Sequence, residues 1–334
     1  MAVYFLLFIF SIIFYYCFRY FRETLILPNL NKRVVFITGC DSGFGRLLAI
    51  KCVKNGIQTF AGCLTSEGAE NLENEVADSE LLKTVELDVT SEDSVKNAVK
   101  FVKENLKSNK KLWAIVNNAG VLLYEGPSEW IGVESYKKTA EVNTYGVIRV
   151  CNAFLPLLRE SKGRIITITS CAGRIGFPLL PSYAVSKFAT EAYMDCLRRD
   201  VYDFGITCHI LEPGRFKTDI VRAENRYPKS KQAWNSLPQE IKDIYGNDYL
   251  EKVDKTFYEI LEEKSTSRLD FVVDAYFHAI SAVNPRLRYI IGYDANFLII
   301  PLSFVPTAIQ DWILRHLARI PIPASVQRSI KKEE

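Results

Sequence analysis

The 334-residue sequence is poor in histidine, has no paired cysteines and carries no large block of like charge. Its three histidines, His209, His278 and His316, are not spaced with cysteine or carboxylate as zinc ligands are, so we expect no metal site. The formal net charge is only +3, from 42 basic and 39 acidic side chains, which gives no reason to expect nucleic-acid binding. Zinc-dependent and nucleic-acid-binding classes are therefore disfavoured.

The eight cysteines include no CxxC pair and show no regular spacing. They lie in apolar segments such as 206–210, where a free cysteine behaves as a small hydrophobic residue. This usage suits a reducing compartment better than a disulfide framework.

No glycine-serine linker or low-complexity stretch divides residues 33–290, although the length would allow two domains. Short β-branched runs alternate there with longer amphipathic stretches, which is typical of βαβ units. We predict strands at 34–37, 58–61, 83–87, 112–116, 164–168 and 207–211, and helices at 44–54, 67–77, 91–107, 134–160 and 182–204. The fold class expected is α/β, a doubly wound parallel sheet (Rossmann fold) in a single domain, with ligands at the carboxyl ends of its strands.

The first 18 residues carry no charge and are almost wholly apolar. A helix of that length rises about 27 Å, close to the ~30 Å hydrocarbon core of a bilayer. The start lacks a basic residue and a small-residue cleavage site, which favours an uncleaved transmembrane anchor over a cleaved signal or a buried helix. Arg19, Arg22, Lys32 and Arg33 follow the apolar run, so the rest of the chain is expected in the cytosol. We expect an anchor at 1–24, a dinucleotide-binding domain at 30–292 and a membrane-associated extension at 293–334.

A glycine-rich turn, Thr38-Gly39-Cys40-Asp41-Ser42-Gly43-Phe44-Gly45, directly follows the first expected strand and opens a helix. Its glycines permit a tight turn and close approach of backbone to a pyrophosphate, and helix N–H groups would face the phosphates. A plain turn is the alternative. The position between strand and helix favours a dinucleotide site.

The choice of dinucleotide depends on charge near the adenosine ribose. Neither the turn residues Cys40, Asp41 and Ser42 nor the segment 62–65 holds a basic side chain, so we expect NAD rather than NADP. An acidic residue that would bind the ribose hydroxyls is also missing from the end of the second strand. Asp88, which ends the third strand, is placed to accept a hydrogen bond from adenine. Its alternative role is a helix N-cap.

The expected catalytic residues follow the fifth strand. Ser170 ends that strand, and Tyr183 and Lys187 lie four apart on the next helix, so they share one face. Lowering a tyrosine pKa from about 10 towards 7 requires roughly 4 kcal/mol of phenolate stabilisation, which a partly desolvated lysine together with an oxidised nicotinamide could supply. Ser170 would then hold the substrate oxygen beside the phenol. A solvated helix face is the alternative for Tyr183 and Lys187.

These motifs resemble the short-chain dehydrogenase/reductase family over most of residues 33–220. The match includes 38–45, the Asn117-Asn118-Ala119-Gly120 run, Asn143, the Ser170, Tyr183 and Lys187 set, and Pro213-Gly214 with Thr218. The resemblance implies that Tyr183 is the general acid/base, that Ser170 orients the substrate and that Asn143 anchors a water relay to Lys187. It implies a dinucleotide held by Thr38, Gly39, Asp41, Ser42, Gly43, Phe44, Gly45, Asp88, Asn117, Ala119, Gly120, Tyr183, Lys187, Pro213, Gly214 and Thr218. From the residues alone, Asn143 could instead be a helix irregularity that satisfies backbone groups, and Pro213-Gly214 only a turn.

Four segments, 38–45, 63–65, 112–114 and 212–218, look like the branch containing membrane-associated retinol dehydrogenases and oxidative hydroxysteroid dehydrogenases. That resemblance implies NAD and an endoplasmic reticulum membrane location. Mitochondrial 3-hydroxybutyrate dehydrogenases share parts of the motifs, so the substrate class stays open. The strand end reads Thr169-Ser170 where relatives often have Ser-Ser. Ser170 keeps the required hydroxyl.

An insertion at 215–265 carries scattered aromatic residues, namely Phe216, Tyr227, Trp234, Tyr245, Tyr249, Phe257 and Tyr258. They could wall a large apolar pocket or only pack surface helices onto the core. The apolar segment 177–181 favours a bulky lipophilic alcohol. A carboxylate substrate would need a fixed cation, either Arg215 or Arg174.

The segment 296–306 is apolar but broken by two prolines, and 309–320 has the pattern of an amphipathic helix on a bilayer surface. The alternatives are that this tail closes the core or makes a subunit contact, which leaves a homodimer open. The sequence thus predicts a membrane-bound NAD-dependent dehydrogenase of a lipophilic alcohol such as retinol or a hydroxysteroid. A hydroxyacid dehydrogenase and a cofactor-binding membrane scaffold with little catalysis are the alternatives.

Overall fold

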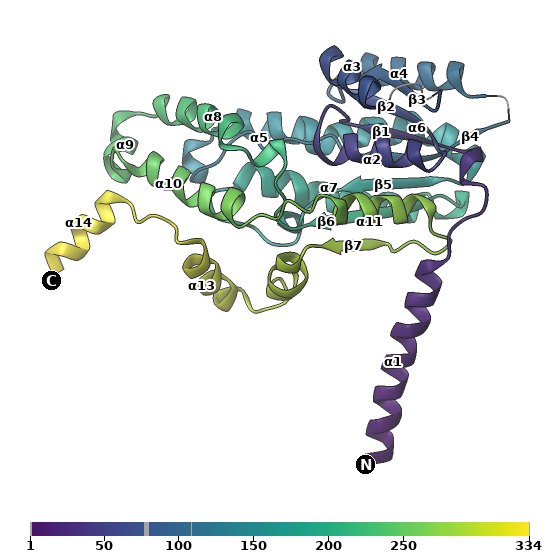
Figure 1. Ribbon diagram of the computed structural model, residues 1–334. Helices are drawn as coiled ribbons and strands as arrows, with labels where there is room; N and C mark the ends of the chain where they lie inside the picture. Colours follow the sequence, from purple (N-terminus) through teal and green to yellow (C-terminus); the bar gives the residue numbers. More distant parts are fainter. Residues whose placement is uncertain (1, 77–79, 108, 334) are drawn as a thin grey trace.

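The sheet at the centre of the molecule is all parallel. The structure is a computed structural model that describes residues 2–76, 80–107 and 109–333 (Figure 1). Within these residues the sheet has seven strands in the order β3-β2-β1-β4-β5-β6-β7. The strands are β1 (Arg33–Thr38), β2 (Gln58–Cys63), β3 (Leu82–Glu86), β4 (Lys111–Asn117), β5 (Arg164–Ile168), β6 (Thr207–Pro213) and β7 (Arg288–Ile291). The predicted doubly wound α/β sheet is confirmed.

Each of the six predicted strands is present within one or two residues of its expected bounds. The seventh, β7, was not predicted because it has only four residues, and one of them is an arginine. It pairs with β6 through Ile210–Pro213 and so extends the sheet by one edge strand.

Helices cover both faces of the sheet (Figure 1). Apolar residues of α2 (Gly43–Lys54), α3 (Ser66–Glu75) and α11 (Asp270–Ser281) pack on one face, beside Val35 and Ile37 of β1. Those of α4 (Glu92–Asn105), α6 (Val147–Ser161) and α7 (Pro181–Asp200) pack on the other, beside Val34 and Phe36. Because successive strand residues point to opposite faces, a strand buried on both faces reads as a continuous apolar run.

The predicted helix at 134–160 is interrupted. It begins as α5 (Val133–Ala140), widens into a π-helical turn (Glu141–Gly146) and continues as α6. Apolar periodicity does not reveal such a turn, since the residues on both sides keep a helical pattern. The wider turn contains Asn143, and π-helical turns occur frequently at functional sites.

The insertion forms a helical cover, made of α8 (Ala223–Asn235), α9 (Gln239–Tyr245), α10 (Tyr249–Phe257) and a π-helical turn (Tyr258–Glu263). Trp234, Tyr245 and Tyr249 lie against Trp130, with ring centroids 4.7–5.5 Å from it. With Tyr227 and Phe257, five of the seven insertion aromatics belong to the apolar cluster that packs the cover. A fully buried ion pair between Arg226 and Glu125 joins α8 to the loop after β4.

The tail forms a π-helical turn (Ala295–Ile299), α12 (Ile300–Leu302), α13 (Thr307–Ala318) and α14 (Ala324–Glu333). Ile299, Leu302 and Leu314 are buried against Cys171 and Ile175, close to the end of β5. On the same helix Trp312 is 62% exposed. The predicted helix at 309–320 is present, and one side of it closes onto the domain.

The N-terminal helix α1 (Ala2–Thr24) projects away from the sheet (Figure 1). Its side chains at Tyr4, Phe8 and Phe10 are exposed. Among the described residues, no helix combines the length and the hydropathy needed to cross a membrane, so the predicted transmembrane anchor is not confirmed. The chain after α1 is fixed to the domain, since Leu27 N–H donates to Ser281 O at 2.8 Å.

Short 3-10 turns complete the described chain, at Leu30–Lys32, Ser128–Trp130, Cys171–Gly173, Tyr202–Phe204 and Asp219–Val221.

Candidate active site

A cavity of about 450 Å³ lies at the carboxyl edge of the sheet. It runs from the turn after β1, past the ends of β4, β5 and β6, to the insertion and the tail. The predicted site residues on its lining are Gly39, Asp41, Ser42, Gly43, Phe44, Asp88, Ala119, Gly120, Ser170, Tyr183, Lys187, Pro213, Gly214 and Thr218. Four others, Thr38, Gly45, Asn117 and Asn143, lie behind this lining, and their contacts are described below.

The glycine turn is built for close backbone contact. Gly39 has a φ of +69°, which side chains with a Cβ rarely adopt. A Cβ on Gly45 would lie 2.3 Å from Gly39 O, so only glycine lets α2 begin this close to β1. Behind the turn the Thr38 hydroxyl accepts from the Asn118 and Ala119 N–H groups at 3.0 Å, which joins β1 to the end of β4.

Asp41 places a carboxylate at the end of β2. It accepts hydrogen bonds from the Leu64 N–H, the Thr65 N–H and the Thr65 hydroxyl, each at 2.9 Å. The acidic group thought to be missing from this strand end is thus supplied by the glycine turn. The sequence did not reveal it because Asp41 belongs to a different segment from the strand it serves.

Asp88 lines the cavity at the end of β3. Its carboxylate accepts from the Thr90 N–H at 2.8 Å and the Thr90 hydroxyl at 2.7 Å. The cap of α4 is Ser91, whose hydroxyl accepts from the Ser94 N–H, so the alternative role of Asp88 as an N-cap is wrong.

Two neighbouring asparagines after β4 have different surroundings. The Asn117 amide is buried and donates to the Thr167 hydroxyl at 3.0 Å, away from the lining. The Asn118 amide donates to Gly39 O at 2.9 Å and reaches the cavity. Asn118 was not among the predicted site residues, although it stands in the same motif.

Ser170, Tyr183 and Lys187 meet in the middle of the cavity. The Ser170 hydroxyl lies close enough to the Tyr183 phenol to lower its pKa, and it accepts from the Ala172 N–H at 3.1 Å. The Lys187 ammonium lies 5.5 Å from the centroid of the Tyr183 ring and donates to Ile168 O at 3.4 Å. The alternative of a solvated helix face is wrong, since Lys187 is only 4% exposed.

Burial dominates the electrostatics of this set. It raises the pKa of Tyr183, against the hydrogen bond from Ser170, which lowers it. Burial also lowers the pKa of Lys187 to about 8, while the nearby Glu191 carboxylate raises it. The protein alone therefore favours a neutral phenol. An oxidised nicotinamide would add the positive charge that a phenolate requires here.

Asn143 holds the loop after β4. Its amide oxygen accepts from the Val121 N–H at 2.8 Å, and its amide nitrogen donates to Val121 O at 2.9 Å and to Ser186 Oγ at 3.0 Å. The Asn143 amide oxygen and Lys187 Nζ both lie beside Gly120, at 3.3 and 3.7 Å from the position of a Cβ there. Asn143 thus satisfies backbone groups, as the alternative supposed, and it does so next to Lys187.

After β6 the chain passes the opposite side of the cavity through Pro213, Gly214 and Thr218. Asp294, at the start of the tail, accepts from the Arg215 N–H and Nε, both at 3.0 Å. This contact fixes the end of β6 where the nicotinamide is expected.

Most of the remaining lining is apolar. The segment 177–180 and two insertion aromatics, Phe216 and Phe257, contribute to it as expected. The tail contributes a wall that sequence reasoning missed, made of Leu298, Ile299, Leu302, Leu314, Leu317 and Ala318. These residues lie far along the chain from the motifs, and their apolar pattern indicated a membrane surface, closure of the core or a subunit contact, but not a wall of the cavity.

A nicotinamide dinucleotide fits these residues. Glycines at 39 and 45 leave the space that a Cβ would fill, and the N-terminus of α2 opens directly onto it. The Asp41 carboxylate stands where the adenosine ribose is held in such folds. Ser170, Tyr183 and Lys187 line the same cavity, between this nucleotide end and the apolar chamber.

Solved structures share this fold. A short-chain dehydrogenase/reductase from Burkholderia phymatum, in complex with NAD, is 22% identical with a TM-score of 0.67, over 83% of this chain and 94% of that one. A short-chain dehydrogenase from Burkholderia cenocepacia, in complex with NADP, is 20% identical with a TM-score of 0.63, over 84% of this chain and 97% of that one. The fold is thus one that holds either dinucleotide.

Sequence relatives cover nearly the whole chain. A 3beta-hydroxysteroid dehydrogenase of Caenorhabditis elegans is 43% identical over 91% of this chain and 81% of its own length. The 17-beta-hydroxysteroid dehydrogenase type 6 of Homo sapiens is 41% identical, over 90% and 93%. Retinol dehydrogenase 7 of Rattus norvegicus is 40% identical, over 89% and 92%.

The family model described as short chain dehydrogenase matches residues 33–229, which include the glycine turn, the Ser170, Tyr183 and Lys187 set and the chain after β6. The resemblance read from the motifs is therefore confirmed. This chain is an oxidoreductase that acts on alcohol donors, and it belongs to the short-chain dehydrogenase family.

Proposed function

We propose that this protein is an NAD-dependent dehydrogenase that oxidises a hydroxyl group on a bulky lipophilic alcohol, such as a retinoid or a steroid. The observation that carries the proposal is the cavity itself, which joins the glycine turn to Ser170, Tyr183 and Lys187 and ends in an apolar chamber. The named activities of the relatives, hydroxysteroid and retinol dehydrogenases, agree with it.

In the proposed reaction Ser170 hydrogen-bonds the substrate oxygen beside the Tyr183 phenol. The phenolate takes the hydroxyl proton, and Lys187 stabilises that phenolate. A nicotinamide held in this cavity would supply the acceptor for the hydride that leaves the carbinol carbon. Lys187 and the loop held by Asn143 then return the proton towards solvent, as the family resemblance implies.

The NAD preference rests on Asp41. A carboxylate at the end of β2 accepts hydrogen bonds from free ribose hydroxyls but repels a 2′-phosphate. Arg46, one turn further along α2, is paired with the Glu75 carboxylate at 2.7 Å and donates to Asn71 O at 2.8 Å. Its guanidinium is therefore already engaged.

A hydroxyacid substrate is less well supported. Both cations considered for its carboxylate are paired, Arg215 with Asp294 at 3.0 Å and Arg174 with Glu212 at 2.9 Å. Lys264, at the end of the insertion, also lines the cavity and would have to bind such a carboxylate. The assembled Ser170, Tyr183 and Lys187 set argues against a scaffold without catalysis.

The test is turnover of all-trans-retinol, androstanediol and 3-hydroxybutyrate with NAD and with NADP. We expect a lipid alcohol with NAD to give the highest kcat/KM. Tyr183→Phe should lower kcat at least 1000-fold, because the base is lost, while the Kd for NAD changes less than about threefold. Retained turnover in Tyr183→Phe would refute the mechanism. No turnover across the panel, with NAD binding intact, would favour the scaffold.

We also propose that α1 attaches the enzyme to the endoplasmic reticulum membrane, with the catalytic domain in the cytosol. Exposed aromatic side chains on α1 and at Phe297 and Trp312 of the tail support this attachment. In Figure 1 both α1 and α13 extend on the lower side of the domain.

Removal of residues 1–24 should shift most of the protein from the membrane pellet to the soluble fraction of lysed microsomes. Unchanged partitioning would place the attachment in the tail instead. Protease digestion of intact microsomes tests the orientation, since a cytosolic domain is cleaved without detergent.

A further inference from the structure

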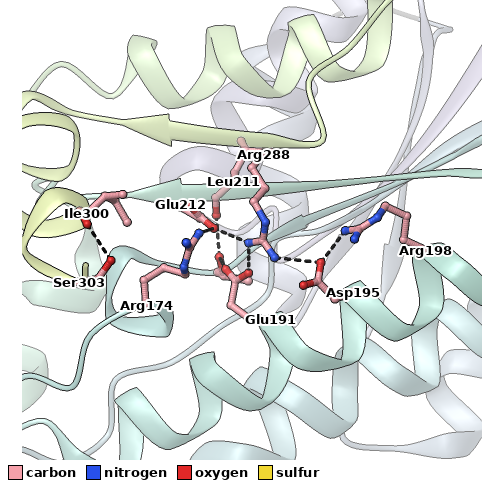
Figure 2. Close-up of polar contacts among 10 residues, drawn as sticks. Arg174, Glu191, Asp195, Arg198, Leu211, Glu212, Arg288, Ile300 and Ser303 are labelled. Atoms are coloured by element: carbon pink, nitrogen blue, oxygen red, sulfur yellow. Dashed lines mark hydrogen bonds and ion pairs between the residues drawn. The ribbon is translucent and has the colours of Figure 1, made fainter. Parts of the chain in front are cut away.

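A network of ion pairs lies beside the catalytic helix α7 (Figure 2). Arg288 of β7 is at its centre and pairs with Glu191, Glu212 and, at 2.9 Å, Asp195. Arg174, which follows the 3-10 turn after Ser170, pairs with Glu212 at 2.9 Å. The network therefore joins α7 to β6, β7 and the chain that leaves β5.

Within this network Glu191 is the member that reaches both the catalytic helix and the residue before Ser170. It lies one helical turn after Lys187 on α7 and is 6% exposed. One carboxylate oxygen is hydrogen-bonded to the hydroxyl of Thr169, the residue before Ser170, and the other to Arg288. The same Thr169 hydroxyl lies 3.0 Å from Leu211 O, so the end of β5 is held from two sides.

The packing between α7 and this strand end is tight. A Cβ on Gly173, three residues after Ser170, would lie 2.9 Å from Glu191 Cγ and 3.1 Å from Lys187 O. Glu191 and Lys187 thus meet the turn after Ser170 at the same place. A shift of the Glu191 side chain would be transmitted to both Ser170 and Lys187, since close-packed groups cannot move independently.

We propose that Glu191 is a positioning residue for the reaction. Its carboxylate holds Ser170 in register with α7 through Thr169, and it places a negative charge one helical turn from the Lys187 ammonium. The inference rests on the proposed dehydrogenase function and on the roles of Ser170, Tyr183 and Lys187 in it.

The charges around Glu191 affect the pKa of its own carboxyl group. Burial and the facing Glu212 of β6 raise the pKa of Glu191, while the Thr169 hydroxyl and Arg288 of β7 lower it. The other charged groups of the network are Arg174, Asp195 and Arg198, which pairs with Asp195. One helical turn away, burial lowers the pKa of Lys187 to about 8, and the Glu191 charge acts in the opposite direction and raises it.

The test is the pH dependence of kcat/KM for Glu191→Gln, with NAD and the best alcohol substrate. Lys187 is charged below its pKa and neutral above it, so activity falls on the alkaline side as the ammonium is lost. Removing the Glu191 charge lowers the pKa of Lys187. The alkaline limb should therefore move to lower pH by about one unit, which is about a tenfold loss of activity on that limb.

Asp195→Asn is the matched control, because it removes a carboxylate of the same helix and network that lies two turns from Lys187. Asp195→Asn should leave the alkaline limb in place, even if it lowers thermal stability as much as Glu191→Gln does. Glu191→Asp keeps the charge and should restore the limb to within a few tenths of a pH unit of wild type. An unshifted limb in Glu191→Gln, or an equal shift in Asp195→Asn, would overturn the charge role.

Thr169→Val tests the second role separately and keeps the shape of the side chain. It should lower kcat about tenfold with the alkaline limb unmoved, because Ser170 loses its support while the Glu191 charge persists. Wild-type kcat in this variant would overturn the positioning role. Active Tyr183→Phe enzyme would instead refute the proposed function, so the two failures are distinguishable.

Discussion

The two ends of the cavity are built differently. The nucleotide end is formed by backbone groups and short polar side chains. An example is the Asp41 carboxylate, which accepts hydrogen bonds from the Leu64 and Thr65 N–H groups. At the substrate end, apolar side chains from the insertion and the tail, such as Phe257 and Leu314, form the walls. The first end is held by directional hydrogen bonds and the second by non-directional packing.

This difference has a consequence for substitution. A hydrogen-bonded carboxylate or a glycine at a close contact has no equivalent replacement. An apolar wall tolerates exchange between side chains of similar volume. Changes at the nucleotide end should therefore alter cofactor use sharply, whereas changes at the substrate end should adjust substrate affinity in small steps.

Asp41→Asn tests the nucleotide end, where the larger effect is expected. Asparagine keeps a hydrogen-bond acceptor for Thr65 but removes the charge that repels a 2′-phosphate. At an effective dielectric constant near 20 that repulsion is worth roughly 1–2 kcal/mol. The ratio of kcat/KM for NADP to that for NAD should rise at least about tenfold. Steady-state kinetics with both dinucleotides measure it.

Asp88→Asn is the control for that prediction, since Asp88 lines the cavity at the neighbouring strand end. It should affect both dinucleotides alike and leave their ratio within about twofold of wild type. An unchanged ratio in Asp41→Asn would show that cofactor choice is set elsewhere.

Leu314→Ala tests the apolar end and should have a smaller effect. It removes about three carbons from the tail wall, so the KM for a bulky lipid alcohol should rise roughly three- to tenfold at similar kcat. Ile309→Ala on the exposed side of the same helix should leave KM unchanged. If Leu314→Ala altered the KM for NAD instead, the separation of the two ends would fail.

Much of the nucleotide end was predictable from sequence because its signals are local. The strands β1 to β6 follow from β-branched runs, and the glycine turn follows from its position between strand and helix. Ser170, Tyr183 and Lys187 were expected to meet because strand ends collect at one edge of a parallel sheet, and they do meet.

What was missed depends on contacts between distant segments. The direction of the Asp41 side chain is fixed by Leu64 and Thr65, and the role of Leu314 depends on how the tail folds back. The π-helical turn at Glu141–Gly146 is flanked by ordinary helical patterns, so periodicity did not place it, although a helix irregularity at Asn143 was one of the two interpretations. Tertiary packing decided each of these features.

The buried pair of Arg226 and Glu125 bears on the order of folding. It joins residues 101 positions apart, and the chain between them includes β5, β6 and α7. Forming this pair early would close a long loop and lose chain entropy before the contacts of the intervening chain could offset that loss. The helical cover is therefore expected to dock last, over a sheet already assembled. Limited proteolysis should accordingly cut the cover before the sheet, releasing a core that keeps its nucleotide end.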